Sequence, residues 1–157
     1  MKRRSLLRGL VAAPVALAAA GVRAADYASP AEVFLAIDAL EAEVGQRLRA
    51  LSEAMPAARA FAGSLLRDHE RQRGDRERLR ARLGLPAGGT LRAAQAGDLL
   101  SLSALRRSQE ALVHAHAEGL PAIGDPIAID RLARHMVELS RHLAVIDLWI
   151  DAEESRG

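Results

Sequence analysis

Apolar residues recur every three or four positions along most of the chain from residue 30 onward, which is the spacing of one face of an α-helix. Ser29 and Pro30, with Glu32 three positions after the serine, form a capping box with proline at the first helical position. Asp125 before Pro126 is a second start signal of the same kind. Together with the glycine and proline breaks, these signals predict helices over about 30–54, 56–84, 98–119 and 126–152.

Strand-forming residues are scarce, because aromatic residues make up only 3% of the chain while alanine, leucine, arginine and glutamate dominate it. The fold class is therefore predicted as all-α. Four amphipathic helices joined mostly by short turns bury their apolar stripes most simply as an up-down-up-down four-helix bundle. The longer link from Gly84 to Asp98 is either an ordinary loop or a connection that crosses the bundle end, and the sequence leaves both open.

The first 24 residues have the pattern of an export signal. Arg3 and Arg4 are followed by two leucines and Arg8, which resembles a twin-arginine signal, and an apolar stretch over 10–20 comes next. Small residues around Ala24 suit a signal peptidase, so we expect cleavage after this residue. Residues 1–24 are thus predicted to engage the twin-arginine export machinery and signal peptidase, and 25–157 to form one helical domain in the periplasm.

Removal of this leader changes the charge of the protein. Its five cations have no acidic counterpart, so the mature chain keeps 17 Lys+Arg against 20 Asp+Glu and a net charge of −3. A mildly acidic domain argues against nucleic-acid binding, which needs clustered cations. The apolar stretch of the leader is short and holds Pro14, so we expect no stable membrane span.

The chain contains no cysteine, so any metal ion has to be held by nitrogen and oxygen. A helical projection places His69 and His116 on apolar faces and His114 on the solvated side. His135 and His142 lie two turns apart near the apolar stripe of the last helix. Counting residues from the predicted turns brings several of these groups to one level of the bundle. The candidate metal ligands are Glu41, His69, Glu110, His135, Glu138 and His142, and the candidate ions are iron, manganese, copper and zinc.

Two short segments carry a family resemblance. The run from Phe61 and Ala62 to Asp68 and His69, and a second run from Met136 to His142, resemble an uncharacterised group of exported bacterial proteins in the ferritin-like superfamily. The resemblance implies a ferritin-like four-helix bundle and permits a metal centre.

The glutamate that di-iron bundles place three residues before each ligand histidine is missing here. Leu66 precedes His69 at that spacing, and Leu139 precedes His142. A standard di-iron oxidase or iron-storage cage is therefore not expected.

Arg76 falls on the apolar line of its helix together with His69, so burial would require an inward carboxylate partner. Glu41, or a glutamate of the last helix, is the expected partner.

Enzyme signatures are absent from the sequence: it has no cysteine nucleophile, no Gly-x-Ser-x-Gly elbow and no phosphate-binding glycine loop. We therefore expect no catalytic residues. Two functions stay open. One is a metal-binding bundle. The other is a non-catalytic structural or envelope-stress interaction protein without a cofactor, whose histidines only hydrogen-bond to neighbouring polar groups.

Overall fold

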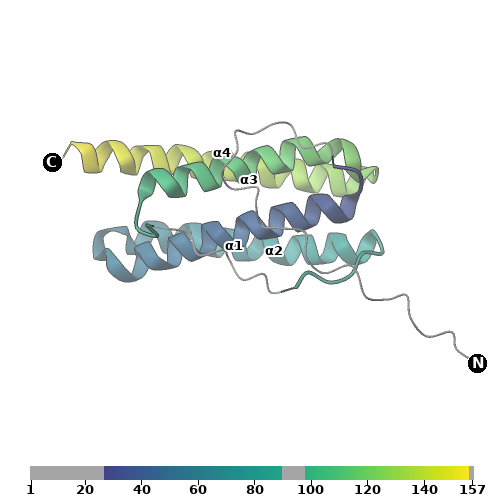
Figure 1. The fold of residues 1–157 in the computed structure, drawn as a ribbon, viewed down its shortest axis with the longest axis horizontal. Helices are drawn as coiled ribbons and strands as arrows, with labels where there is room; N and C mark the ends of the chain where they lie inside the picture. The colour runs from purple at the N-terminus through teal and green to yellow at the C-terminus, as the bar shows by residue number, and fades with distance from the viewer. Residues whose placement is uncertain (1–26, 90–97, 156–157) are drawn as a thin grey trace, which may run out of the picture.

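A computed structural model describes residues 27–89 and 98–155. Over these residues the chain is all-helical and has no strands, which confirms the predicted fold class (Figure 1). The elements are α1 (Pro30–Ala54), the 3-10 turn η1 (Pro56–Ala58), α2 (Arg59–Arg82), α3 (Leu102–Ile123) and α4 (Pro126–Glu154).

The capping signals act as expected at two helix starts. Ser29 Oγ accepts a hydrogen bond from the Glu32 N–H at the start of α1, and the Asp125 carboxylate accepts one from the Ala128 N–H at the start of α4. Glu32 also reaches back to accept the N–H of Ala28. Each cap satisfies backbone donors that have no partner inside the helix.

Helix α3 is displaced from the predicted range of 98–119. It begins after Ser101, whose hydroxyl accepts the N–H of Ala104. It then continues through Gly119 and Pro121, beyond the predicted end at 119, and stops at Gly124, whose φ of 69° is a left-handed conformation that glycine adopts without strain.

The predicted up-down-up-down order is wrong, because α3 runs parallel to α2 and antiparallel to α1 (Figure 1). The C-terminal part of α3 lies at the beginning of α1, where Gly119 touches Val33. The Asp98 carbonyl, just before α3, instead accepts a hydrogen bond from Arg47 near the end of α1 (2.9 Å). The order is therefore up-down-down-up, with one long connection between α2 and α3.

The described parts of this connection lie along the hairpin of α1 and α2. The Pro86 carbonyl accepts a bond from Arg80, and the N–H of Gly88 donates to Glu77, one turn farther back along α2. An extended chain covers about 3.3–3.6 Å per residue, against 1.5 Å in a helix, so the link from 83 to 101 is long enough to return along a helix the length of α2. Link length alone permits either direction of α3, which is why the sequence left it open.

The apolar core is built mainly by α1, α3 and α4. Helix α2 contributes few apolar side chains, and its inward line carries His69, Gln72 and Arg76, all buried. The middle of the bundle is therefore polar on the α2 side. The buried apolar cluster consists of Val33, Phe34, Ile37, Val44, Leu48, Leu51, Ala62, Leu65, Leu79, Leu105, Leu112, Ala115, Ile123, Ala128, Leu132, Leu139 and Ile146.

Gly119 is required where α1 and α3 cross closely, because a Cβ at this position would collide with the side chain of Val33. We expect Gly119→Ala to lower the free energy of unfolding by about 1–3 kcal/mol, since overpacking outweighs the gain of about 1 kcal/mol in helix propensity. Chemical denaturation measures the change. The double variant with Val33→Ala should recover part of the loss, and a stabilised Gly119→Ala protein would contradict the close packing.

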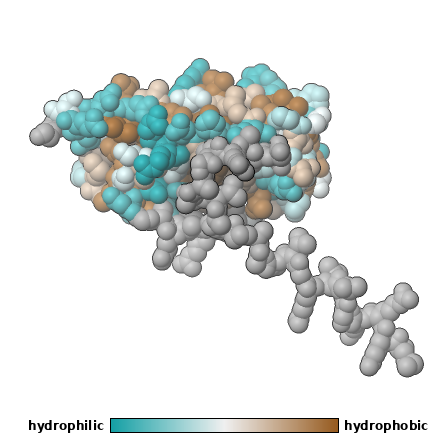
Figure 2. Space-filling model, turned by 45° about the horizontal axis from the view of Figure 1, so that its top comes forward, coloured by the Kyte–Doolittle hydropathy of each residue, from teal (hydrophilic) through white to brown (hydrophobic). Residues whose placement is uncertain are grey.

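Hydrophilic and hydrophobic residues are interspersed on the face shown in Figure 2. Among the described helices, none combines the length and apolar character needed to cross a membrane.

Candidate functional site in the polar interior

Side chains of α2 and α4 meet in a regular antiparallel series, which we call the α2–α4 seam. The two backbones approach each other less closely than the other neighbouring helices do, so the contacts are made by long and polar side chains. For each turn toward the C-terminus of α2, the partner on α4 lies a turn nearer its N-terminus. The pairs are Phe61 with Trp149, Asp68 with His142, Gln72 with Glu138, Asp75 with His135, and Arg82 with Asp125.

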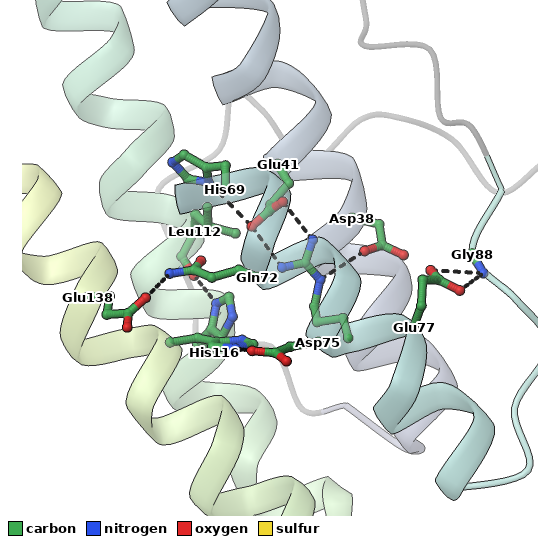
Figure 3. A network of polar contacts seen from close by, with 12 residues as sticks. Asp38, Glu41, His69, Gln72, Asp75, Glu77, Gly88, Leu112, His116 and Glu138 are labelled. Atoms are coloured by element: carbon green, nitrogen blue, oxygen red, sulfur yellow. Dashed lines mark hydrogen bonds and ion pairs between the residues drawn. The ribbon is translucent and has the colours of Figure 1, made fainter. Parts of the chain in front are cut away.

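Arg76 lies inside this seam, facing α1, and only 1% of its surface is exposed. Its guanidinium donates two hydrogen bonds to the Glu41 carboxylate, at 2.8 and 2.6 Å, and a third from Nε to Asp38 at 3.2 Å (Figure 3). Of the two expected partners, Glu41 and a glutamate of the last helix, Glu41 is the one that Arg76 binds. Asp38 also forms an ion pair with Arg80. The positive charges of the two arginines on α2 are therefore balanced by the two carboxylates on α1.

His69 and His142 form a ring pair whose centroids lie 5.2 Å apart. Nδ1–H of His69 donates to Glu41 at 3.4 Å, and Nε2–H of His142 donates to Asp68 at 3.2 Å. In the neutral form of either ring, these acceptors place the proton on that nitrogen. The other nitrogens, His69 Nε2 and His142 Nδ1, are buried and have no hydrogen-bond partner among the described residues. Each ring therefore presents an unused lone pair inside the protein.

His116 and His135 form a second ring pair, with centroids 6.3 Å apart. Nδ1–H of His116 donates to the Leu112 carbonyl of its own helix at 2.8 Å (Figure 3). Nε2–H of His135 donates to Asp75 at 3.2 Å. His116 Nε2 and His135 Nδ1 are again buried without a partner. All four interior histidines thus share one arrangement, with one nitrogen fixed by an acceptor and the other free.

Burial is the main cause of the shifted histidine pKa values. It lowers the pKa of His116 to about 4, and it also lowers the pKa of His135, with the charge of Arg76 adding to the effect at both rings. Burial and then the neighbouring His69 lower the pKa of His142. These three rings are therefore neutral at pH 7, which is the form that binds a metal ion.

Glu41 stays ionised although it is buried. Burial by itself raises its pKa, but the hydrogen bond from His69 and the guanidinium of Arg76 together outweigh this and bring the pKa down to about 2. The Glu41 carboxylate thus accepts hydrogen bonds from both the Arg76 guanidinium and the His69 ring.

The structure brings some of the predicted ligands together and separates others. Glu41, His69 and His142 are neighbours, whereas His135 lies with His116. Glu138 is at the edge of the seam, where Gln72 and Arg71 bind its carboxylate.

Glu110 lies outside the cluster. Its side chain is 45% exposed and bound to Arg106, because the neighbouring Gln109 takes the inward position of that turn and donates to the Leu139 carbonyl. The six predicted ligands therefore do not converge. Within the described residues no group of three or more histidine and acidic side chains has the geometry to hold a metal ion.

Sequence reasoning missed the acceptors on α2 that orient two of the histidines. Asp68 and Asp75 are seven residues apart, as are His135 and His142, and an antiparallel pairing of α2 with α4 matches the two spacings. The shared seven-residue interval was the sequence signal for these two Asp–His pairs. It indicates a contact only when α2 and α4 are known to face each other.

Comparison of the chain with protein-family models, with curated proteins and with solved structures finds no match. A function therefore has to be argued from the geometry of the polar interior itself.

Proposed function

We propose that this protein is an exported, ferritin-like helical bundle that binds a transition-metal ion through imidazole side chains in its interior. One observation carries the proposal. Four buried histidines each donate one ring N–H to a carboxylate or carbonyl, and the other nitrogen of each ring has no hydrogen-bond partner within residues 27–89 and 98–155.

This arrangement is the usual one around metal-bound histidine. A ligating imidazole almost always donates its second N–H to a carboxylate or backbone carbonyl, which fixes the tautomer and makes the ligating nitrogen more basic. A buried acceptor without a partner costs free energy, which an ion or an ordered water would repay. Imidazole nitrogen suits zinc, copper, iron and nickel.

The bundle type and the location of the protein belong to the same proposal. A single long connection between the second and third helices is a feature of ferritin-like bundles, and α2 and α3 are joined in this way. The twin-arginine pattern at Arg3 and Arg4 supports export to the periplasm, with cleavage after Ala24. We propose no catalytic role for the chain.

The alternative is a structural or interaction protein whose free histidine nitrogens bind buried water. It is favoured by the absence of any three-ligand group among the described residues, and buried waters do satisfy such nitrogens in other proteins. The two functions differ in metal content, and also in whether a chelator changes the thermal midpoint.

Elemental analysis of the full-length protein, exported and purified without an affinity tag or chelator, tests the proposal. We expect near-stoichiometric transition metal in the wild type and its loss in His69→Ala and His142→Ala. The matched control is His114→Ala, which removes an exposed histidine of α3 and should leave the metal content unchanged. Wild-type protein that stays metal-free, even after reconstitution with iron, manganese, copper and zinc ions, would leave only the structural function.

A further inference from the structure

Exposed apolar side chains gather on α4. Of the six large apolar side chains that are exposed among the described residues, four belong to this helix. Val137 and Leu148 are 50% and 67% exposed, and Val145 lies between them on the same side of the helix. The buried positions of α4, such as Leu139 and Ile146, lie on the opposite side. This outer side therefore leaves apolar surface in water.

The outer side of α4 has the spacing of a coiled-coil seam. Its residues recur at alternating intervals of four and three, and all of them are exposed: Asp130, Arg134, Val137, Arg141, Ala144, Leu148 and Asp151. We call these seven residues the α4 outer strip. We propose that the strip binds the same strip of a second copy of the chain in the antiparallel direction, which gives a dimer with two-fold symmetry.

One register of this pair matches apolar and charged residues at the same time. It is set by placing Val137 opposite Leu148 of the second copy. In an antiparallel pair, three steps back along one helix are three steps forward along the other, so Arg134 then lies opposite Asp151 of the second copy. The two-fold axis repeats both contacts. The dimer therefore gains two apolar pairs and two ion pairs.

Other arrangements of the two strips lose this match. A shift of seven residues in one direction places Asp130 opposite Leu148, and a shift in the other direction leaves Arg134 beyond the end of the second helix. A parallel pair with two-fold symmetry places each residue opposite its own copy, so Arg134 faces Arg134 and Asp151 faces Asp151. The charges thus favour the antiparallel direction and this register.

The strip is suited to a weak dimer. The Arg134 side chain is 70% exposed and already binds Asp130 on its own helix, so Asp151 of the second copy adds a second carboxylate at the surface. Arg141 lies opposite Ala144, which leaves room for the aliphatic part of the arginine while its guanidinium stays in water. The two copies of Arg141 lie near the symmetry axis and repel each other. We therefore expect a Kd in the range of about 1–100 µM.

Sedimentation velocity of the full-length protein, exported and purified, tests the proposal at chain concentrations from about 1 to 300 µM. We expect a reversible monomer–dimer equilibrium in the wild type, with or without a chelator. Leu148→Asp should raise the Kd at least about tenfold, because it buries a carboxylate against Val137. The matched control is Leu35→Asp, which changes a leucine of α1 that is 57% exposed and should leave the Kd unchanged.

A charge exchange tests the register. Arg134→Glu and Asp151→Arg each place like charges opposite one another, so each should raise the Kd at least about fivefold. The double variant pairs opposite charges again and should return the Kd to within about threefold of the wild type. Arg134 is exposed in the single chain, so these changes should not alter the free energy of unfolding measured below the Kd.

Circular dichroism reports whether each variant is folded, and Val137→Asp replaces Leu148→Asp if the latter is not. A wild-type protein that stays monomeric at the highest concentration would overturn the proposal. A dimer that Leu148→Asp leaves intact would place the interface elsewhere and overturn it as well. A double charge variant that associates no better than the single variants would refute the antiparallel register. None of these outcomes depends on bound metal, so they leave the proposed function untouched.

Discussion

Replacing Arg76 by methionine is expected to lower the free energy of unfolding by about 3–5 kcal/mol, the usual cost of removing one partner of a buried ion pair. The guanidinium is almost fully buried and makes three charge-assisted bonds to Glu41 and Asp38. Methionine fills a similar volume but leaves the Glu41 carboxylate buried without its cation. For a domain of this size the loss corresponds to a fall of roughly 10–20 °C in Tm.

Urea denaturation with a double variant separates the charge from the packing. Arg76→Met combined with Glu41→Gln removes both charges, so it should recover a large part of the stability lost in the single variant. The matched control is Arg134→Met, whose guanidinium is 70% exposed and binds Asp130 on the surface. This control should change stability by no more than about 0.5 kcal/mol. An Arg76→Met protein as stable as the control would show that the pair contributes little.

Stability is expected to fall steadily as the pH is lowered from about 6.5. The pKa of His116 is about 4 in the folded protein against 6.5 in the unfolded chain, so the unfolded chain binds more protons between these values. The contribution of His116 is complete above pH 6.5 and is lost on acidification toward pH 4. At 1.36 kcal/mol per pKa unit it amounts to about 3 kcal/mol.

Glu41 extends the loss to lower pH. Its folded pKa of about 2 lies below the ordinary 4.5, so its contribution is present above pH 4.5 and is lost as the pH falls toward 2. His135 and His142, whose pKa values are also lowered, act in the same direction as His116.

Urea midpoints measured on metal-free protein between pH 7.5 and 3 test this expectation. His116→Leu cannot be protonated, so its stability should depend less on pH between 6.5 and 4, by about 3 kcal/mol over that interval. His114→Leu changes an exposed histidine and should follow the wild-type curve. Identical curves for the wild type and His116→Leu would mean that the buried ring does not resist protonation.

The predictions that succeeded from the sequence concern single helices or neighbouring helices of a hairpin. The all-helical fold, the caps at Ser29 and Asp125, and the inward direction of His69 follow from the period of 3.6 residues and from local hydrogen bonding. For Arg76 the sequence offered Glu41 or a glutamate of the last helix, and the contact within the α1–α2 hairpin decides for Glu41.

The predictions that failed concern segments far apart in the chain. The period of a helix says which side chains share a face, but the direction of α3 depends on where the link from 83 to 101 leads, and link length permits both directions. Only the tertiary structure places Asp68 and Asp75 against the histidines of α4. The inward position of Gln109, by contrast, follows from its helical spacing to Leu105 and Leu112, and Glu110 lies one position away from that line. The sequence by itself thus determined the four helices and the inward histidines. The tertiary structure decided which histidines meet, because helix-to-helix contacts are set by packing and chain path rather than by local spacing.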